Sequence, residues 1–254
     1  MEKFIEIPNL PKGEVSLVVC DGRINSDVEY NLREMGIKII KTNKQKLLYE
    51  AVSYHPDILF HHLGGDKIVI TPNVDDKFYY ALEDEGFDLI LGKDKIEGKY
   101  PKDVLYNVAR LKDVAILNIR YTDEILLDEL IKRNIKLIDV KQGYAKCSIC
   151  IVSEDAIITS DRGIYKKALQ NSINSLLIKP GHIDLFELNY GFIGGCTGFI
   201  SNDTIAFYGE VESHPEGVEI KNFLNKFEKK HQNLSKGKLI DYGTLIPLKE
   251  YCII

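Results

Sequence analysis

PDILFHHLGGDKIVITPN (Pro56–Asn73) is the first of four segments of 18 residues that align with one another without gaps. The other three are KDVLYNVARLKDVAILNI (Lys102–Ile119), AKCSICIVSEDAIITSDR (Ala145–Arg162) and GGCTGFISNDTIAFYGEV (Gly194–Val211). Each segment contains an apolar run, a polar break and a second apolar run, which is the pattern of a β-hairpin. A spacing of about 46 residues between such segments is typical of propellers and other repeat arrays.

A helical stretch and a further strand follow each hairpin. Three of these joints align at a residue that can end a helix in the left-handed conformation, namely Gly36, Gly86 and Asn134. We therefore predict an α/β fold of five ββαβ units, arranged as a five-bladed propeller with pseudo-fivefold symmetry in a single domain, residues 1–254. The predicted units span about 15–50, 54–93, 100–140, 143–181 and 191–249.

The first predicted unit is incomplete, because Val15–Cys20 matches the second strand of a hairpin and has no first strand before it. The stretch Gly243–Lys249 is a strand without a partner at the other end of the chain. We predict that these two strands pair, which would close the ring of units and leave no free sheet edge there. Met1–Ile7 is the rival partner, although Pro8 and Pro11 interrupt its approach to Val15.

Composition excludes several classes of protein. The chain has 254 residues, 44% of them hydrophobic, with 33 Lys and Arg against 38 Asp and Glu and a net charge of −5. These are ordinary values for a folded domain, and the mildly acidic balance argues against a nucleic-acid partner. The longest apolar runs have the length of strands, so we predict no membrane partner. Met1–Pro11 lacks the apolar segment of a signal peptide, which predicts a cytoplasmic location.

The five cysteines also favour a reducing compartment, because they are an odd number in a chain without an export signal. Cys147 and Cys150 form a CxxC pair inside Lys146–Val152, which we predict to be a strand. On a strand this spacing points the two thiols to opposite faces, and no second pair completes a zinc site. We therefore predict buried, apolar cysteines, no metal and no cofactor.

Five ββαβ units in a ring resemble the pentein fold of the guanidino-group-modifying enzymes, which include arginine and agmatine deiminases, dimethylargininase and amidinotransferases. The resemblance covers Val15–Lys249, and the sequence looks most like an uncharacterised clostridial-type family assigned to that fold. It implies a Cys nucleophile, a His acid/base and carboxylates that bind the guanidinium. It also implies a non-enzymatic possibility, since the eukaryotic ribosome anti-association factor has this fold.

The motifs of these enzymes are largely missing. Their nucleophile stands in a pattern like Cys-x-Ser/Thr-x-Pro-Leu, but the matching stretch here is Tyr242–Leu248, with Gly243 or Tyr242 in place of the thiol. The family histidine is absent from Gly191–Gly194, where the fifth unit begins. The best local match is Ser160–Gly163, which resembles the family's Ser-x-Arg-Thr. We predict a small-molecule-binding or scaffolding protein without the usual deiminase chemistry. The alternative is a divergent hydrolase or transferase acting on a guanidino or amino-acid-like substrate.

Polar residues follow the second strand of each hairpin, where pseudo-symmetry would bring them together near the axis. We predict that they bind a cationic or zwitterionic small molecule. For any one of them, the competing interpretation is a helix N-cap or turn residue, and Asp27, Thr122 and Asp161 are the expected caps. The predicted ligand-binding residues are Asp21, Arg23, Asn25, Asn73, Asn118, Asp161, Arg162, Glu210 and Glu212.

Three residues are weak candidates for catalysis. Cys196 lies among glycines in Gly194–Gly198, where it is either a nucleophile or a small buried apolar residue. His214 follows two glutamates and is either a general base or a loop histidine. His62 lies in a predicted strand beside His61 and is either directed inward or part of the core.

Overall fold

The structure is a computed structural model that describes residues 1–252. It contains five small β-sheets, and in each of them an antiparallel pair of strands is extended by a further strand that runs parallel to one of the pair. Four sheets have three strands each: β4 (Phe60–Gly64), β5 (Lys67–Ile70) and β6 (Asp88–Leu91); β7 (Ala109–Arg110), β8 (Val114–Leu117) and β9 (Lys136–Asp139); β10 (Ile149–Ser153), β11 (Ala156–Thr159) and β12 (Asn174–Leu177); β13 (Thr197–Phe199), β14 (Thr204–Phe207) and β15 (Lys230–Asn233).

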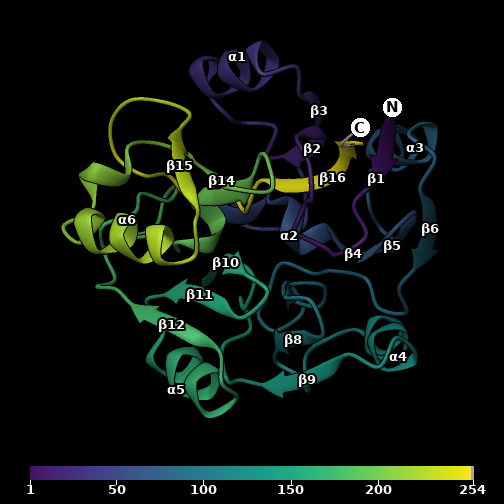
Figure 1. The fold of residues 1–254 in the computed structure, drawn as a ribbon. Helices are drawn as coiled ribbons and strands as arrows, with labels where there is room; N and C mark the ends of the chain where they lie inside the picture. The colour runs from purple at the N-terminus through teal and green to yellow at the C-terminus, as the bar shows by residue number, and fades with distance from the viewer. Residues whose placement is uncertain (253–254) are drawn as a thin grey trace.

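The remaining sheet joins the two ends of the chain. Its strand order is β1 (Glu2–Phe4), β16 (Ile246–Tyr251), β2 (Val15–Cys20) and β3 (Lys38–Lys41). The predicted pairing of the last strand with Val15–Cys20 is confirmed, since Ile246 lies opposite Val19 in an antiparallel ladder. The rival segment also takes part, because β1 pairs with the other edge of β16. Both chain ends therefore lie close together, as Figure 1 shows.

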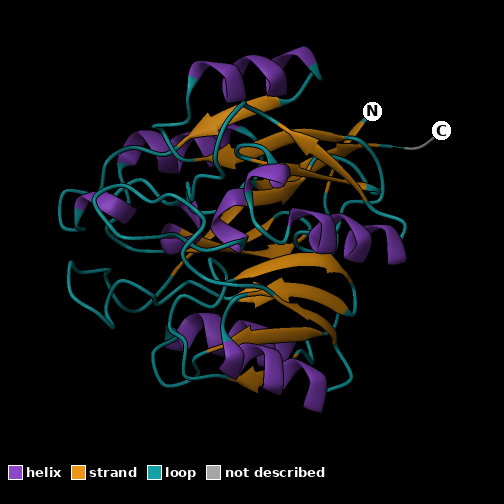
Figure 2. Ribbon diagram, turned by 90° about the vertical axis from the view of Figure 1, so that its left-hand side faces the viewer, coloured by secondary structure: helices purple, strands orange, loops and turns teal. Residues whose placement is uncertain are grey.

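In every sheet, a helix connects the two strands that run parallel to each other. These helices are α1 (Ser26–Glu34), α3 (Asp76–Asp84), α4 (Glu124–Lys132), α5 (Arg162–Gln170) and α6 (Gly217–Lys226). Figure 1 shows these helices at the periphery and the sheets following one another around the molecule in chain order, and Figure 2 shows the strands between outer helices. The predicted α/β class is thus confirmed. The short helices α2 (Pro56–Leu59), η1 (Glu50–Val52), η2 (Gly194–Cys196) and η3 (Val211–Ser213) lie in the connections.

The helix ends follow the sequence signals closely. Gly36, Gly86 and Asn134 have φ of 75°, 86° and 56°, as expected for left-handed residues after a helix. Of the predicted N-caps, Asp161 caps α5, but α1 is capped by Asn25 rather than Asp27. Likewise α4 is capped by Asp123, not Thr122, because the carboxylate reaches two backbone amides at once.

Several predicted element boundaries are wrong by a few residues. The strand predicted at Lys146–Val152 begins at Ile149, so Cys147 lies in the segment before β10 and not on the strand. The last strand begins at Ile246 rather than Gly243. Within residues 1–252, no helix is both long and apolar enough to cross a bilayer.

The hairpin geometry decides where a site can form. Phe60 pairs with Ile70, Ile149 with Thr159 and Ile246 with Val19, so the first strand of each hairpin begins where the second strand ends. Residues just before the first strands and just after the second strands therefore occupy the same end of each sheet.

Candidate functional site

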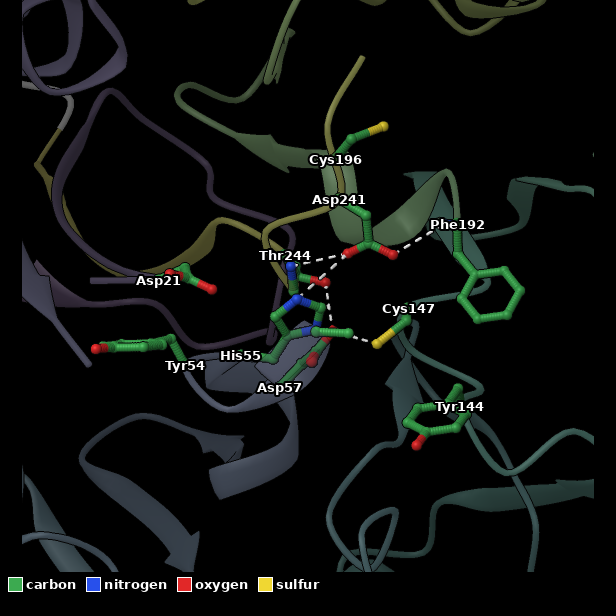
Figure 3. A network of polar contacts seen from close by, with 12 residues as sticks. Asp21, Tyr54, His55, Asp57, Tyr144, Cys147, Phe192, Cys196, Asp241 and Thr244 are labelled. Carbon is green, nitrogen blue, oxygen red and sulfur yellow. Dashed lines mark hydrogen bonds and ion pairs between the residues drawn. The ribbon is translucent and has the colours of Figure 1, made fainter. Parts of the chain in front are cut away.

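A group of buried polar side chains gathers at that end, and we call it the thiol cluster. It consists of His55, Asp57, Cys147, Asp241 and Thr244, all almost fully buried. The Cys147 thiol donates to Asp57 Oδ2 over 3.0 Å, and the Thr244 hydroxyl lies 2.8 Å from the same oxygen. Figure 3 shows these side chains converging from segments before β4, β10 and β16.

Asn107 fixes the position of Cys147. Its side-chain oxygen accepts hydrogen bonds from the backbone amides of Lys146, at 2.7 Å, and Cys147, at 3.3 Å. Its amide nitrogen donates to Cys147 Sγ at 3.2 Å and to the Asp57 carbonyl at 3.1 Å. One buried amide thus ties the thiol to the segment that carries Asp57.

His55 fills the space beside Gly243. Gly243 has φ of 73°, and a Cβ placed on it would lie 2.3 Å from His55 Cγ. A side chain at position 243, cysteine included, therefore cannot coexist with His55 in this position. Both ring nitrogens of His55 lack a hydrogen-bond partner among the described residues, and Nε2 lies 4.0 Å from Asp241 Oδ1.

Asp241 is held by the backbone on one side. Its Oδ2 accepts from the Phe192 amide at 2.8 Å and its Oδ1 from the Gly243 amide at 2.9 Å. Gly195 packs so closely that a Cβ there would lie 1.8 Å from Asp241 Oδ1. The close approach expected of the Gly194–Gly198 glycines is therefore made toward this carboxylate.

Burial shifts the protonation equilibria of the cluster. Removal from water raises the pKa of Asp57 to about 6 and that of Asp241 to about 7, and the Asp57 carboxylate contributes to the raised pKa of Asp241. Burial lowers the pKa of His55 to about 3, so the imidazole is neutral. Burial and Asp57 hold the pKa of the Cys147 thiol well above its ordinary value. Lys146, also fully buried, has a lowered pKa for the same reason.

A cavity of about 300 Å³ opens onto the cluster. His55, Cys147 and Asp241 line it, so the thiol cluster is in contact with a space large enough for a small molecule. The rest of its wall is mostly aromatic and aliphatic, and includes Tyr49, Tyr144, Tyr190, Phe192, Leu185 and Leu188. The cavity wall therefore combines one carboxylate, a thiol and an imidazole with aromatic faces that can contact a cation.

Of the predicted ligand-binding residues, Asp21 and Arg23 lie nearest this cluster. Asp21 is fully buried and forms a two-point ion pair with Arg23, whose guanidinium also donates to the Glu50 and Ala51 carbonyls. The same guanidinium lies over the rings of Tyr54 and Phe186, at 4.7 and 4.4 Å from their centroids. Its donors are thus already satisfied by the protein.

The other predicted ligand-binding residues contact structural partners. Asn25 and Asp161 are helix N-caps, and Arg162, at the start of α5, is exposed. Asn73 and Asn118 donate to the carbonyls of Ile96 and Lys141. Glu210 accepts from the Gly237 amide, while Glu212 binds Lys221 and Asn233. None of these residues lines the 300 Å³ cavity.

The predicted catalytic candidates also lie outside the cavity wall. Cys196 donates to the Ile193 carbonyl at 3.2 Å and points away from His55 in Figure 3. His214 lies against His182 and contacts the Lys179 carbonyl, and His62 contacts the Gly65 carbonyl at 2.9 Å. His61 and His62 are both buried.

Sequence reasoning did not identify His55, Asp57, Cys147 or Asp241 as site residues. The prediction of apolar surroundings for Cys147 is wrong, because Asp57, Asn107 and its position before β10 give it polar contacts. The absence of a metal site was predicted from spacing along the chain, whereas His55, Asp57 and Cys147 form a set of possible metal ligands assembled from distant segments. The available signal was the polar sequence His55-Pro56-Asp57 at the start of an aligned repeat.

Comparison with solved structures defines the fold. The inosamine-phosphate amidinotransferase StrB1 of Streptomyces griseus matches with a TM-score of 0.58 and 8% identity over 98% of both chains. SxtG, an amidinotransferase of Microseira wollei in saxitoxin biosynthesis, gives 0.57 and 9% over 91% of both chains. The agmatine deiminase of C. jejuni gives 0.56 and 10% over 92% of this chain and 91% of its own. The protein therefore has the pentein fold of guanidino-modifying enzymes.

The sequence itself identifies a narrower group. Residues 19–246 match the model of a family of unknown function, DUF6873, and the chain belongs to that family. No curated protein matches the sequence.

Proposed function

We propose that the protein is a divergent hydrolase or transferase acting on a cationic guanidino or amino-acid-like small molecule, with Cys147 as the nucleophile. The observation that carries the proposal is the thiol cluster, in which Cys147 donates to Asp57 beside a neutral imidazole on the wall of a 300 Å³ cavity. A nucleophile, a base and an orienting group within reach of one another are the recurring arrangement of covalent catalysis. The five-bladed closed ring remains part of this proposal, and the pairing of β16 with β2 supports it.

The charge balance of the cavity favours a cationic substrate. Asp57 and Asp241 are buried near the cavity, and Arg23 is already paired with Asp21. Lys146 is a buried basic side chain on which both Asp57 and Asp241 act electrostatically. Its Nζ contacts Thr244 Oγ1 at 3.4 Å. A planar cation offers donors to both carboxylates and compensates their charge where water is excluded.

The first proton transfer takes place between Cys147 and Asp57, which are already in contact. The Cys147 thiol gives its proton to Asp57, and the thiolate adds to the central carbon of the guanidinium. The carbon–nitrogen bond of the leaving amine then breaks, and the protonated Asp57 supplies the proton that the amine takes. Water, or an acceptor amine in a transferase, next adds to the thiouronium carbon and gives its proton to His55. The carbon–sulfur bond breaks, and the sulfur recovers a proton.

A bound cation is required for this sequence. Burial and Asp57 keep Cys147 protonated in the free protein, whereas a guanidinium beside it favours the thiolate. Binding without turnover is the second candidate function, and the raised pKa of Cys147 is the observation that favours it. A cytoplasmic location suits the enzyme, since reducing conditions keep this thiol free.

The test compares the rates at which two alkylating reagents, one cationic and one neutral, modify Cys147. A haloacetamidine carries a cation next to its reactive carbon, whereas a haloacetamide of similar size is neutral. We expect the cationic reagent to modify Cys147 at least tenfold faster, with the modified residue identified by mass spectrometry. Equal rates for the two reagents, or preferential modification of another cysteine, would contradict the proposed site.

Turnover is then measured with L-arginine, agmatine, methylated arginines and guanidinoacetate by release of ammonia, amine or ureido product. We expect Cys147→Ser to abolish any activity that the wild type shows. Cys196→Ser is the matched control, because Cys196 is equally buried but does not line the cavity. Loss of activity in the control alone would assign the nucleophile to Cys196, as the sequence suggested. Cation-selective alkylation without turnover of the panel would favour the binding function.

A further inference from the structure

The thiol cluster also has the composition of a transition-metal site. One ligand atom each from His55, Asp57 and Cys147 lies within 4.8 Å of the other two, and all three side chains are buried. Sulfur, imidazole nitrogen and carboxylate oxygen together are the donors that Zn²⁺ takes in proteins. Acidic clusters that bind Mg²⁺ or Ca²⁺ offer oxygen alone, so the thiol and imidazole select for a softer ion.

Unpartnered atoms in the cluster point to a missing ligand. Neither His55 Nδ1 nor Nε2 has a hydrogen-bond partner among the described residues, and Asp57 Oδ1 has none either. Buried imidazole and carboxylate groups are normally hydrogen-bonded, because leaving them bare costs their full desolvation energy. An ion between the three side chains would use a nitrogen of His55, an oxygen of Asp57 and the sulfur that now donates to Asp57.

The surroundings provide a fourth ligand and a path of entry. Asp241 Oδ1 lies 4.0 Å from His55 Nε2, and backbone amides of Phe192 and Gly243 hold this carboxylate in place. Backbone donors of this kind orient metal ligands in known sites. The cavity reaches His55, Cys147 and Asp241, so an ion can enter without unfolding the chain. Zn²⁺ bond lengths of about 2.0–2.3 Å require the ligand atoms to close in by about 1 Å.

We propose that His55, Asp57 and Cys147, with Asp241 as the fourth ligand, bind a thiophilic divalent cation of the Zn²⁺ class. Binding releases the Cys147 proton to solvent and leaves a thiolate on the metal. The same sulfur cannot hold the metal and attack a carbon, so the ion and the cationic substrate exclude each other. Only this mutual exclusion rests on the function proposed above, and it makes the ion an inhibitor of the proposed enzyme.

Cobalt spectroscopy tests the site directly. The full-length protein is freed of metal with a chelator, the chelator is removed, and Co²⁺ is added in steps. We expect one equivalent to produce a thiolate-to-cobalt charge-transfer band and the visible bands of tetrahedral cobalt, both removed by Zn²⁺. Cys147→Ser should lose the charge-transfer band, and His55→Gln or Asp57→Asn should weaken binding at least tenfold. Cys196→Ser, the control, should keep the wild-type spectrum.

Two results would overturn the proposal: no charge-transfer band in the wild type, or an equal band in Cys147→Ser. Since a variant can fail to fold, circular dichroism checks each one, and a second measurement uses the wild type alone. Excess Zn²⁺ should raise its melting temperature by several degrees, while Mg²⁺ should leave it unchanged, and equal effects of the two ions would also refute the site. None of these readouts involves turnover. Cys147-dependent activity without cobalt binding would refute the metal site and leave the proposed enzyme standing. Cobalt binding without Cys147-dependent activity would refute the proposed enzyme and leave the metal site standing.

Discussion

Gly243→Ala tests whether His55 fills the space beside residue 243. Gly243 has φ of 73°, and a Cβ there would meet Cγ, Cβ and Cα of His55 at 2.3, 2.4 and 2.7 Å. The left-handed backbone costs an alanine about 1–2 kcal/mol. Forcing a methyl group into a packed interior costs about 1–3 kcal/mol more. We therefore expect the free energy of unfolding to fall by roughly 2–5 kcal/mol.

Gly36→Ala is the matched control for this measurement. Gly36 has nearly the same φ, 75°, but nothing lies within 4 Å of a Cβ placed on it. Its substitution should cost only the backbone term, about 1–2 kcal/mol. Urea denaturation of the wild type and both variants gives the two differences. Equal losses for the two glycines would mean that His55 does not fill the space beside residue 243.

Three further predictions concern stability. Ending the chain after Leu245 removes β16 and exposes the edges of β1 and β2, so we expect unfolding or aggregation in size-exclusion chromatography and circular dichroism; a truncated chain that melts like the full one would contradict this. Arg23→Ala should cost about 3–5 kcal/mol because it leaves Asp21 buried without its partner, whereas Arg33→Ala, in an exposed pair with Glu29, should cost under about 1 kcal/mol in the same denaturation assay. Burial lowers the pKa of His62 to about 4. In the unfolded chain this histidine is protonated below about pH 6.5, whereas in the folded chain it is protonated only below about pH 4. Stability should therefore fall as the pH drops through this window, and His62→Gln should flatten the slope by about 1 kcal/mol per pH unit; an unchanged slope would be inconsistent with a buried neutral His62.

The α/β class and the repeated strand–helix order could be predicted because short-range sequence patterns specify each strand, turn and helix end. Alternating apolar runs, polar breaks and residues such as Gly36 and Asn134 act within a few positions, and the structure follows them. Errors arose where long-range contacts decide a boundary. Cys147 was assigned to a strand by its apolar neighbours, but hydrogen bonds from Asn107 hold it in the preceding segment.

The residues predicted to bind a ligand lie at the same end of the sheets as the thiol cluster, but they follow the second strands, whereas the cluster residues precede the first strands. The second strands lead outward into helices, so the polar residues after them, such as Asn25 and Asp161, bind the first backbone amides of α1 and α5. The first strands begin from interior connections instead. His55, Cys147 and Asp241 precede β4, β10 and β16, and although α2 begins directly after His55, the His55 side chain makes no capping hydrogen bond.

The thiol cluster draws its members from several equivalent segments, each of which precedes the first strand of an antiparallel pair. His55 precedes β4, Cys147 precedes β10 and Gly243 precedes β16. His55 can lie beside Asp57 and Cys147 because residue 243 has no side chain, since a Cβ there would lie 2.3 Å from His55 Cγ. The glycine at 243 and the imidazole in the cluster are therefore coupled. A cysteine placed at 243 would displace His55 from the cluster rather than add a second thiol to it.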